Sequence, residues 1–214
     1  LMSISGTSEA PIRNLAFKGL RFSYTSWMGP SEATGYANQQ SGAFLKDVSP
    51  IRPADAWSSC GWGCPEFESM RQLWHQIPAA VQVAAARDII FENNHFTQLG
   101  QIALGLGNEA VANLSGVGLG VQDVRVSRNH FGVLSGSAIM AGGVRLDAHH
   151  PTDPNLVNRN IEIADNVIAG VSQDYKDNAA ILTTYIDGAR ILHNDITDAP
   201  YDAIAVGWGW GYND

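Results

Sequence analysis

The chain has 214 residues, of which 45% are hydrophobic and only 16% are charged. It is therefore long enough to form one domain with its own core, and too apolar for a disordered protein. The formal net charge of −8, with 13 Lys and Arg, argues against a nucleic-acid-binding protein and favours neutral or weakly charged partners. No hydrophobic run approaches the roughly 18 residues of a membrane-spanning helix.

The first predicted element covers residues 12–24, where hydrophobic and polar side chains alternate as in a β-strand. The alternation then stops, and we expect residues 25–77 to form a long insertion. Within it, residues 66–75 are the one candidate helix. Cys60 and Cys64 flank a Gly-Trp-Gly segment. A local disulfide and two free thiols both fit this pair, whereas a zinc site requires four ligands.

A repeated unit begins at Pro78 and continues to the end of the sequence. Each copy contains a short apolar strand, an asparagine and a second short apolar strand. The repeated asparagines are Asn94, Asn129, Asn166 and Asn194. The first strand region has Leu20 in the corresponding place, and a second insertion, residues 144–159, interrupts the repeat.

This pattern predicts an all-β fold, a right-handed parallel β-helix of about five coils. Strands of successive coils then stack about 4.8 Å apart, and each asparagine occupies the same turn. The amide side chains can bond to the turn backbone and to the asparagine of the next coil, forming an Asn ladder. We expect one domain over residues 1–214, and because neither end carries a polar capping unit, we expect the natural protein to continue at both ends.

In such a solenoid, one face and its loops form an open wall that suits a glycan. Alignment of the second strands places Gln101, Ser137, Ala179 and Asp202 in one row. Aromatic rings stack on sugar faces. The aromatic substrate-binding candidates are Tyr185, Tyr201, Trp208, Trp210 and Tyr212. We add His193, beside the last ladder asparagine, as a further candidate.

Glycoside cleavage requires two carboxylates. The candidates near the aromatic row are Asp174, Asp187 and Asp202, although each also fits an ordinary turn aspartate. The second insertion contains Asp147 and the adjacent pair His149-His150, but neighbouring strand residues point to opposite faces. The sequence therefore predicts no metal site and no cofactor.

The segment Pro-Tyr-Asp-Ala-Ile-Ala-Val-Gly-Trp-Gly-Trp-Gly, at residues 200–211, resembles β-helical glycoside hydrolases, in particular glycoside hydrolase family 141. The stretches that begin at Phe17 and Pro78 look like early coils of the same family. The resemblance implies fucosidase- or xylanase-like activity. It also implies that the strongest acidic motifs, Asp-Gly-Gly and Asp-Glu-Gly, follow the Trp-Gly-Trp segment, and neither occurs in this sequence.

We therefore expect a secreted or periplasmic protein that hydrolyses plant-type polysaccharides, with catalytic acids beyond Asp214 and weak or no turnover by residues 1–214 alone. A non-catalytic glycan-binding or adhesin β-helix is the alternative, and a polysaccharide lyase is the third interpretation. The expected partner is a polysaccharide or oligosaccharide. We expect neither a nucleic-acid partner nor a membrane span.

Overall fold

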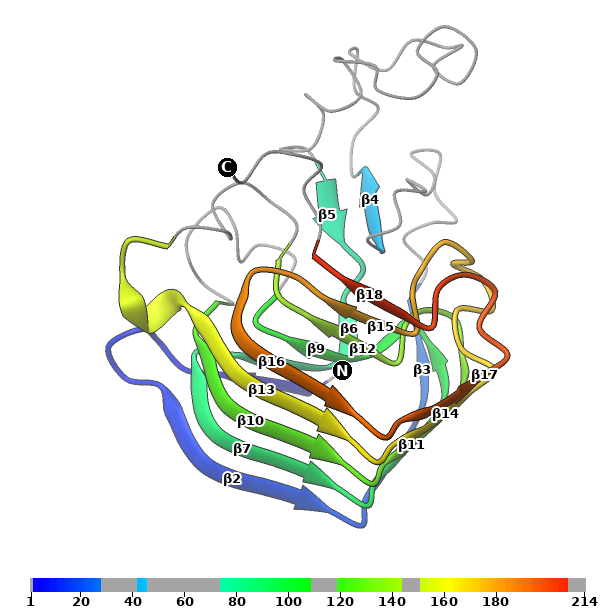
Figure 1. The fold of residues 1–214 in the computed structure, drawn as a ribbon, viewed down its shortest axis with the longest axis horizontal. Helices are drawn as coiled ribbons and strands as arrows, with labels where there is room; N and C mark the ends of the chain where they lie inside the picture. Colours follow the sequence, from blue (N-terminus) through cyan, green and yellow to red (C-terminus); the bar gives the residue numbers. More distant parts are fainter. Residues whose placement is uncertain (1, 28–41, 46–73, 109–118, 144–150, 208–214) are drawn as a thin grey trace, which may run out of the picture.

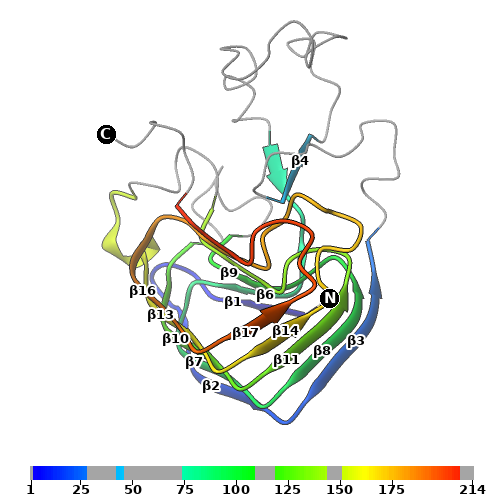
Figure 2. The ribbon, with the colours of Figure 1, turned by 45° about the vertical axis from the view of Figure 1, so that its right-hand side comes forward.

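A computed structural model describes residues 2–27, 42–45, 74–108, 119–143 and 151–207. Three parallel sheets make up the body of this part (Figures 1 and 2). Sheet A consists of β1 (Met2–Ser5), β6 (Ala79–Ala84), β9 (Ile102–Leu106), β12 (Ile139–Ala141), β15 (Ile181–Thr183) and β18 (Ile204–Val206). Sheet B consists of β2 (Ile12–Lys18), β7 (Ala86–Glu92), β10 (Val121–Ser127), β13 (Asn158–Ala164) and β16 (Ile186–Leu192). Sheet C consists of β3 (Arg21–Ser26), β8 (His95–Gly100), β11 (His130–Leu134), β14 (Val167–Ala169) and β17 (Asp195–Thr197).

The chain visits the sheets in the order A, B, C and then returns to A. The described strands form five such coils, which begin at β1, β6, β9, β12 and β15, and β18 starts the next coil. The predicted right-handed parallel β-helix is therefore confirmed. An antiparallel pair, β4 (Ala43–Leu45) with β5 (Trp74–Gln76), lies between the first and second coils, and the short 3₁₀ helix η4 (Pro154–Leu156) lies between β12 and β13 within the fourth coil.

The core lies inside the solenoid, where identical positions of successive coils stack. Phe22, Phe96 and Phe131 of sheet C form a continuous stack with ring centroids 4.7 Å apart at each step. In sheet B, Phe17 stacks on Phe91 at 5.0 Å. Phe91, Phe96 and Phe131 are fully buried. In-register pairing thus converts a sequence repeat into columns of like side chains.

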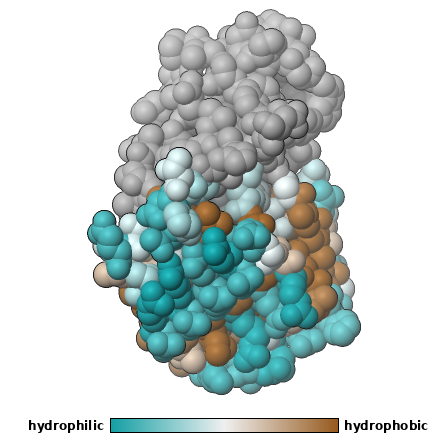
Figure 3. Space-filling model, turned by 60° about the vertical axis from the view of Figure 1, so that its left-hand side comes forward, coloured by the Kyte–Doolittle hydropathy of each residue, from teal (hydrophilic) through white to brown (hydrophobic). Residues whose placement is uncertain are grey.

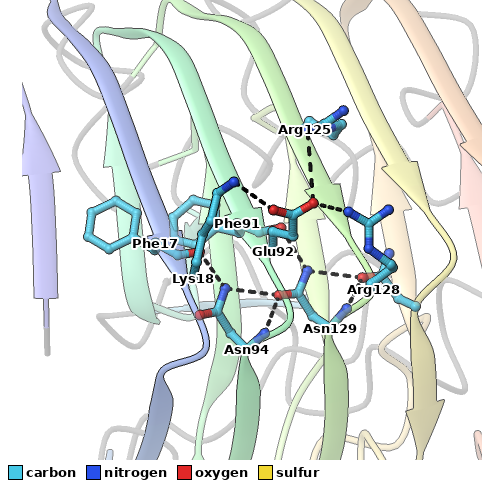
Figure 4. Close-up of polar contacts among 9 residues, drawn as sticks. Phe17, Lys18, Phe91, Glu92, Asn94, Arg125, Arg128 and Asn129 are labelled. Carbon is cyan, nitrogen blue, oxygen red and sulfur yellow. Dashed lines mark hydrogen bonds and ion pairs between the residues drawn. The ribbon is translucent and has the colours of Figure 1, made fainter.

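The predicted Asn ladder is present at the corner between sheets B and C (Figure 4). Each asparagine Nδ2 donates to the Oδ1 of the next, at 2.9 Å from Asn94 to Asn129, 3.0 Å from Asn129 to Asn166 and 2.8 Å from Asn166 to Asn194. Each Nδ2 also donates to a carbonyl of the preceding coil, such as Phe17 O. Leu20 lacks this side chain, but its backbone N–H donates to Asn94 Oδ1.

The backbone explains why an asparagine is needed at this corner. The residue before each ladder position adopts a left-handed conformation, with φ between 50° and 66°, in Gly19, Asn93, Arg128, Asp165 and His193. This sharp turn removes local backbone partners, and the amide supplies them. A second row of residues in the left-handed conformation bends the strands of sheet B. Its members are Asn, Asp and Gly, which tolerate this conformation best: Asn14, Asp88, Asp123, Asn160 and Gly188.

Several sequence predictions concern residues outside the described ranges. These are Cys60 and Cys64, Asp147 with the histidine pair, and most of the candidate helix at 66–75. The described end of that candidate, residues 74–75, is part of strand β5 and not helical. No helix among the described residues has the length and apolarity needed to cross a bilayer.

Candidate functional site

The long connections leave the solenoid at the two ends of the sheet A strands, that is, at the corners with sheets C and B. We call these two corners the edges of sheet A. Residues 27–78 and 170–180 lead from sheet C into sheet A, whereas residues 107–120 and 142–157 lead from sheet A to sheet B. The connections between sheets B and C, by contrast, are the short turns of the Asn ladder. Side chains from different coils and connections therefore meet around the outer face of sheet A.

In the middle coils, the outer face of sheet A is buried. The sequence predicted an open surface there. Met140 and Leu182, which point away from the solenoid core, are each only 1% exposed. They belong to a second hydrophobic cluster with Ile77, Ala79, Ile102 and Tyr175, against which Trp27 and Ala205 pack. Trp27 meets Tyr175 edge to face at 5.8 Å.

Amide side chains line this cluster and connect neighbouring coils. Gln82 Nε2 donates to Asn108 Oδ1 at 2.7 Å, and Asn108 Nδ2 donates to the Met140 carbonyl at 2.8 Å. Gln76 Nε2, which lies on the β5 strand, contacts Met140 Sδ at 2.9 Å. The middle of the sheet A face is therefore a closed, hydrogen-bonded layer, and a bound polymer could reach this side only at its margins.

The predicted row on sheet A is shifted by one residue in one coil. Leu104 pairs with Ile139, which pairs with Ile181, which pairs with Ile204. When this pairing is extended by two residues towards the N-terminus of each strand, Ile102 aligns with Ser137, Ala179 and Asp202. Gln101 is therefore not a member of this row.

Tyr201 and Asp202, two of the predicted residues, lie together at the edge where sheet C leads into sheet A. The Asp202 carboxylate lies close enough to the Tyr201 hydroxyl to oppose its ionisation. Burial of the ring and then the Asp202 carboxylate raise the pKa of Tyr201, with a smaller contribution from Asp177. Both Tyr201 and Asp202 are exposed, so this edge presents an aromatic ring and a carboxylate to a ligand.

Asp177 is a member of this group that sequence reasoning missed. It is only 7% exposed, in the connection between β14 and β15, one coil before Tyr201. The sequence could have indicated Asp177, because it lies in a connection from sheet C to sheet A, as Asp202 does in the next coil. Asp174, in that same connection, accepts a hydrogen bond from Ser135 Oγ at 2.6 Å. Its charge and, more strongly, burial raise the pKa of Tyr175.

The other predicted residues lie at different corners. Tyr185, with φ of 47°, and the exposed Asp187 are at the edge between sheets A and B, and Asp187 pairs in register with Arg159. His193 is at the corner between sheets B and C, with Nδ1 3.7 Å from Asp165 Oδ1. Figure 3 brings forward the left-hand side of Figure 1, where hydrophilic residues predominate.

The three remaining predicted residues, Trp208, Trp210 and Tyr212, lie outside the described residues. The last described position before them is Gly207, with φ of 79°, whose N–H donates to the Thr183 carbonyl. Among the described residues, no three His, Cys, Asp or Glu side chains gather as metal ligands. The described candidates thus form one local group, Tyr201 with Asp202 and Asp177, and several separate positions.

Comparison with known proteins gives one informative similarity. No protein-family model matches the chain, and no curated protein matches it. A solved structure named glycoside hydrolase is 28% identical, with a TM-score of 0.74. The match covers 98% of this chain and 33% of the other, so this chain spans about a third of the length of that protein. The chain is therefore similar, in sequence and in its parallel β-helix, to part of a glycoside hydrolase.

Proposed function

We propose that this chain is the β-helical part of a carbohydrate-active protein that hydrolyses glycosidic bonds in plant-type polysaccharides. The observation that carries the proposal is the similarity to a glycoside hydrolase over 98% of the chain. Fucosidase- or xylanase-like specificity and membership of glycoside hydrolase family 141 are finer parts of the same proposal, supported by the Trp-Gly-Trp segment. A secreted or periplasmic location follows from a polysaccharide substrate.

We place substrate contact at the sheet A edge that carries Tyr201 and Asp202. A phenol ring can stack on a sugar face, and a carboxylate held beside it can bind sugar hydroxyls. Hydrolysis requires an acid and a base or nucleophile on opposite sides of the scissile bond. Asp202 can supply one such group, and the resemblance to family 141 implies that the strongest acidic motifs follow the Trp-Gly-Trp segment.

A non-catalytic glycan-binding function is the second candidate. Of the predicted carboxylates, Asp174 lies on the same side as Asp202 but is engaged by Ser135 Oγ at 2.6 Å, whereas Asp187 and Asp202 lie at opposite ends of the sheet A strands. These two residues therefore do not form an acid–base pair across one bond. Under this function, Tyr201 and Asp202 bind sugar and no cleavage follows.

The test measures binding and cleavage of the same neutral xylo-oligosaccharide, together with release of nitrophenol from an aryl fucoside. We expect Tyr201→Ala to weaken binding about threefold to tenfold, since loss of one stacked ring costs about 0.5–1.5 kcal/mol. Tyr24→Ala is the matched control, because Tyr24 is 74% exposed but lies on sheet C.

The outcomes separate the two functions. Cleavage by the protein supports the hydrolase. Binding that depends on Tyr201, without cleavage by the full-length protein, supports the glycan-binding function. Equal losses in Tyr201→Ala and Tyr24→Ala would exclude the sheet A edge as the site under either function.

A further inference from the structure

Positive charges gather at one corner of an otherwise acidic protein. Lys18 ends β2 and Arg21 begins β3 on either side of the first turn between sheets B and C. Arg125 lies near the end of β10, and Arg128 lies in the following turn, two coils further along. We call these four residues the corner patch. The coil stacking brings Lys18, Arg125 and Arg128 around one carboxylate, although they are up to 110 residues apart in sequence (128 − 18), and Arg21 lies three residues after Lys18, across the turn.

A single buried carboxylate lies beneath three of these cations (Figure 4). Glu92 is 7% exposed, and its Oε2 is 2.7 Å from Lys18 Nζ. Its Oε1 contacts the Arg128 guanidinium and lies 4.0 Å from Arg125 Nη2. These five side chains, the corner patch and Glu92, sum to +3, whereas the whole chain carries −8; in the next coil Glu162 lies in register with Arg125, and Asp165 follows Arg128 in the turn row.

The cationic groups remain available to a ligand. The side chains of Lys18, Arg125 and Arg128 are 54%, 46% and 51% exposed, and Arg21 is also exposed. Of the three cations that face Glu92, Arg125, at 4.0 Å, is the least engaged. The Asn ladder fixes the backbone of the turns from which these side chains extend, so the patch is held in place before a ligand arrives.

The carboxylates nearby limit the patch to the first three coils. In the next coil Glu162 lies beside Arg125 in register, but it pairs with Arg190 at 3.3 Å. Asp123 lies at the left-handed bend of sheet B, where its Oδ1 accepts from Asn160 Nδ2 at 2.9 Å. The corner therefore changes from basic to mixed charge along the solenoid axis.

We propose that the corner patch binds the carboxylate groups of a uronate-bearing polysaccharide that runs along the solenoid axis. The cations come from the first and third coils, about 10 Å apart along that axis, and guanidinium groups bind carboxylates through paired hydrogen bonds. Exposed His95 and His130, whose rings stack at 5.5 Å, lie in register with Arg21 and border the patch. This site is separate from the sheet A edge, and it rests on the proposed function only for the choice of a glycan.

The overall charge favours an acidic glycan over nucleic acid. The patch carries +3, so the rest of the chain carries −11 (−8 − 3). A nucleic acid carries one charge on every phosphate and extends beyond a patch of this size, where the remaining surface repels it. A glycan with a few carboxylates can place them on the patch alone.

The test titrates oligogalacturonate into the purified protein by calorimetry, at low and at high salt. We expect binding that weakens as salt rises, because exposed ion pairs are screened. Arg21→Gln and Arg125→Gln should each weaken binding about threefold, the effect of one exposed ion pair. Arg13→Gln is the matched control, since it removes the same charge from an exposed position near the opposite end of β2, outside the patch.

Four results would overturn the proposal: no binding of oligogalacturonate at low salt, equal binding of a neutral xylo-oligosaccharide, an unchanged affinity in both patch variants, or an equal loss in Arg13→Gln. Tighter binding of single-stranded DNA of equal charge through the same arginines would reassign the patch to nucleic acid. Because cleavage is not measured, failure of the proposed hydrolase function leaves this test unaffected.

Discussion

Asn129 offers the sharpest test of what holds the coils together. It is 2% exposed, and its side chain makes four hydrogen bonds. Oδ1 accepts from the backbone N and from Nδ2 of Asn94, both at 2.9 Å, and Nδ2 donates to Phe91 O and Asn166 Oδ1, both at 3.0 Å. In Asn129→Ala, the Asn94 N–H and the Phe91 carbonyl lose these partners inside the protein.

The expected loss of stability follows from these orphaned groups. Each buried polar group left without a partner costs about 1–3 kcal/mol. Two such groups predict that Asn129→Ala lowers the free energy of unfolding by about 4 kcal/mol. That is a large part of the total stability of a domain this size.

Asn194→Ala is the matched control at the last coil. Its Oδ1 accepts from Asn166 and its Nδ2 donates to Ile163 O at 2.9 Å, but the residue is only partly buried. Water can replace the lost partners there, so we expect a loss of about 1 kcal/mol.

Urea denaturation followed by circular dichroism gives both values. Equal losses in the two variants, or a loss below about 1 kcal/mol in Asn129→Ala, would show that the ladder does not stabilise the interior coils in the way argued here.

Three further predictions concern packing, backbone strain and ionisation. Phe131→Ala should lower the free energy of unfolding by about 4 kcal/mol, and Phe22→Ala, at the partly buried end of the same stack, by less, both measured in urea. Gly142→Ala should lower the free energy of unfolding by about 3 kcal/mol in the same assay, because φ is 86° and a Cβ would overlap the Thr184 carbonyl oxygen. Gly19→Ala should lower it by only about 1 kcal/mol, because φ is 66° but the space is open. Asp202→Asn should lower the pKa of Tyr201 towards its ordinary value, which NMR of labelled tyrosine rings can follow, because the carboxylate that opposes formation of the phenolate is removed; an unchanged pKa would contradict the pairing of these two residues.

The repeat predicted the fold because one residue type recurs at a position that the turn geometry demands. Asn94, Asn129, Asn166 and Asn194 were sufficient to predict the ladder, and the alternating apolar residues around them predicted the strands. The register on sheet A was less accessible. The offset from Asn94 to Asn129 is 35 residues, and Leu104 pairs with Ile139 at the same offset, so a strict count would have aligned Gln101 with Gly136.

The candidate site was only partly predictable. Tyr201 and Asp202 are adjacent in sequence, so their association was visible, whereas Asp177 approaches them through the return of the chain to sheet A. Composition also concealed the corner patch. A net charge of −8 describes the whole chain, but the stacking of coils concentrates cations from two separate stretches, residues 18–21 and 125–128, at one corner.

The Asn ladder also gives the solenoid a direction and a unit of growth. Asn94, Asn129 and Asn166 each donate an Nδ2 hydrogen to the Oδ1 of the asparagine in the following coil. Each coil therefore has a donor side and an acceptor side that match those of any other coil. Duplication or deletion of one complete coil restores the same contacts across the new junction, whereas a change of part of a coil breaks them. A gene for such a protein can lengthen in whole coils without a new core, and its loops can diverge independently of the ladder.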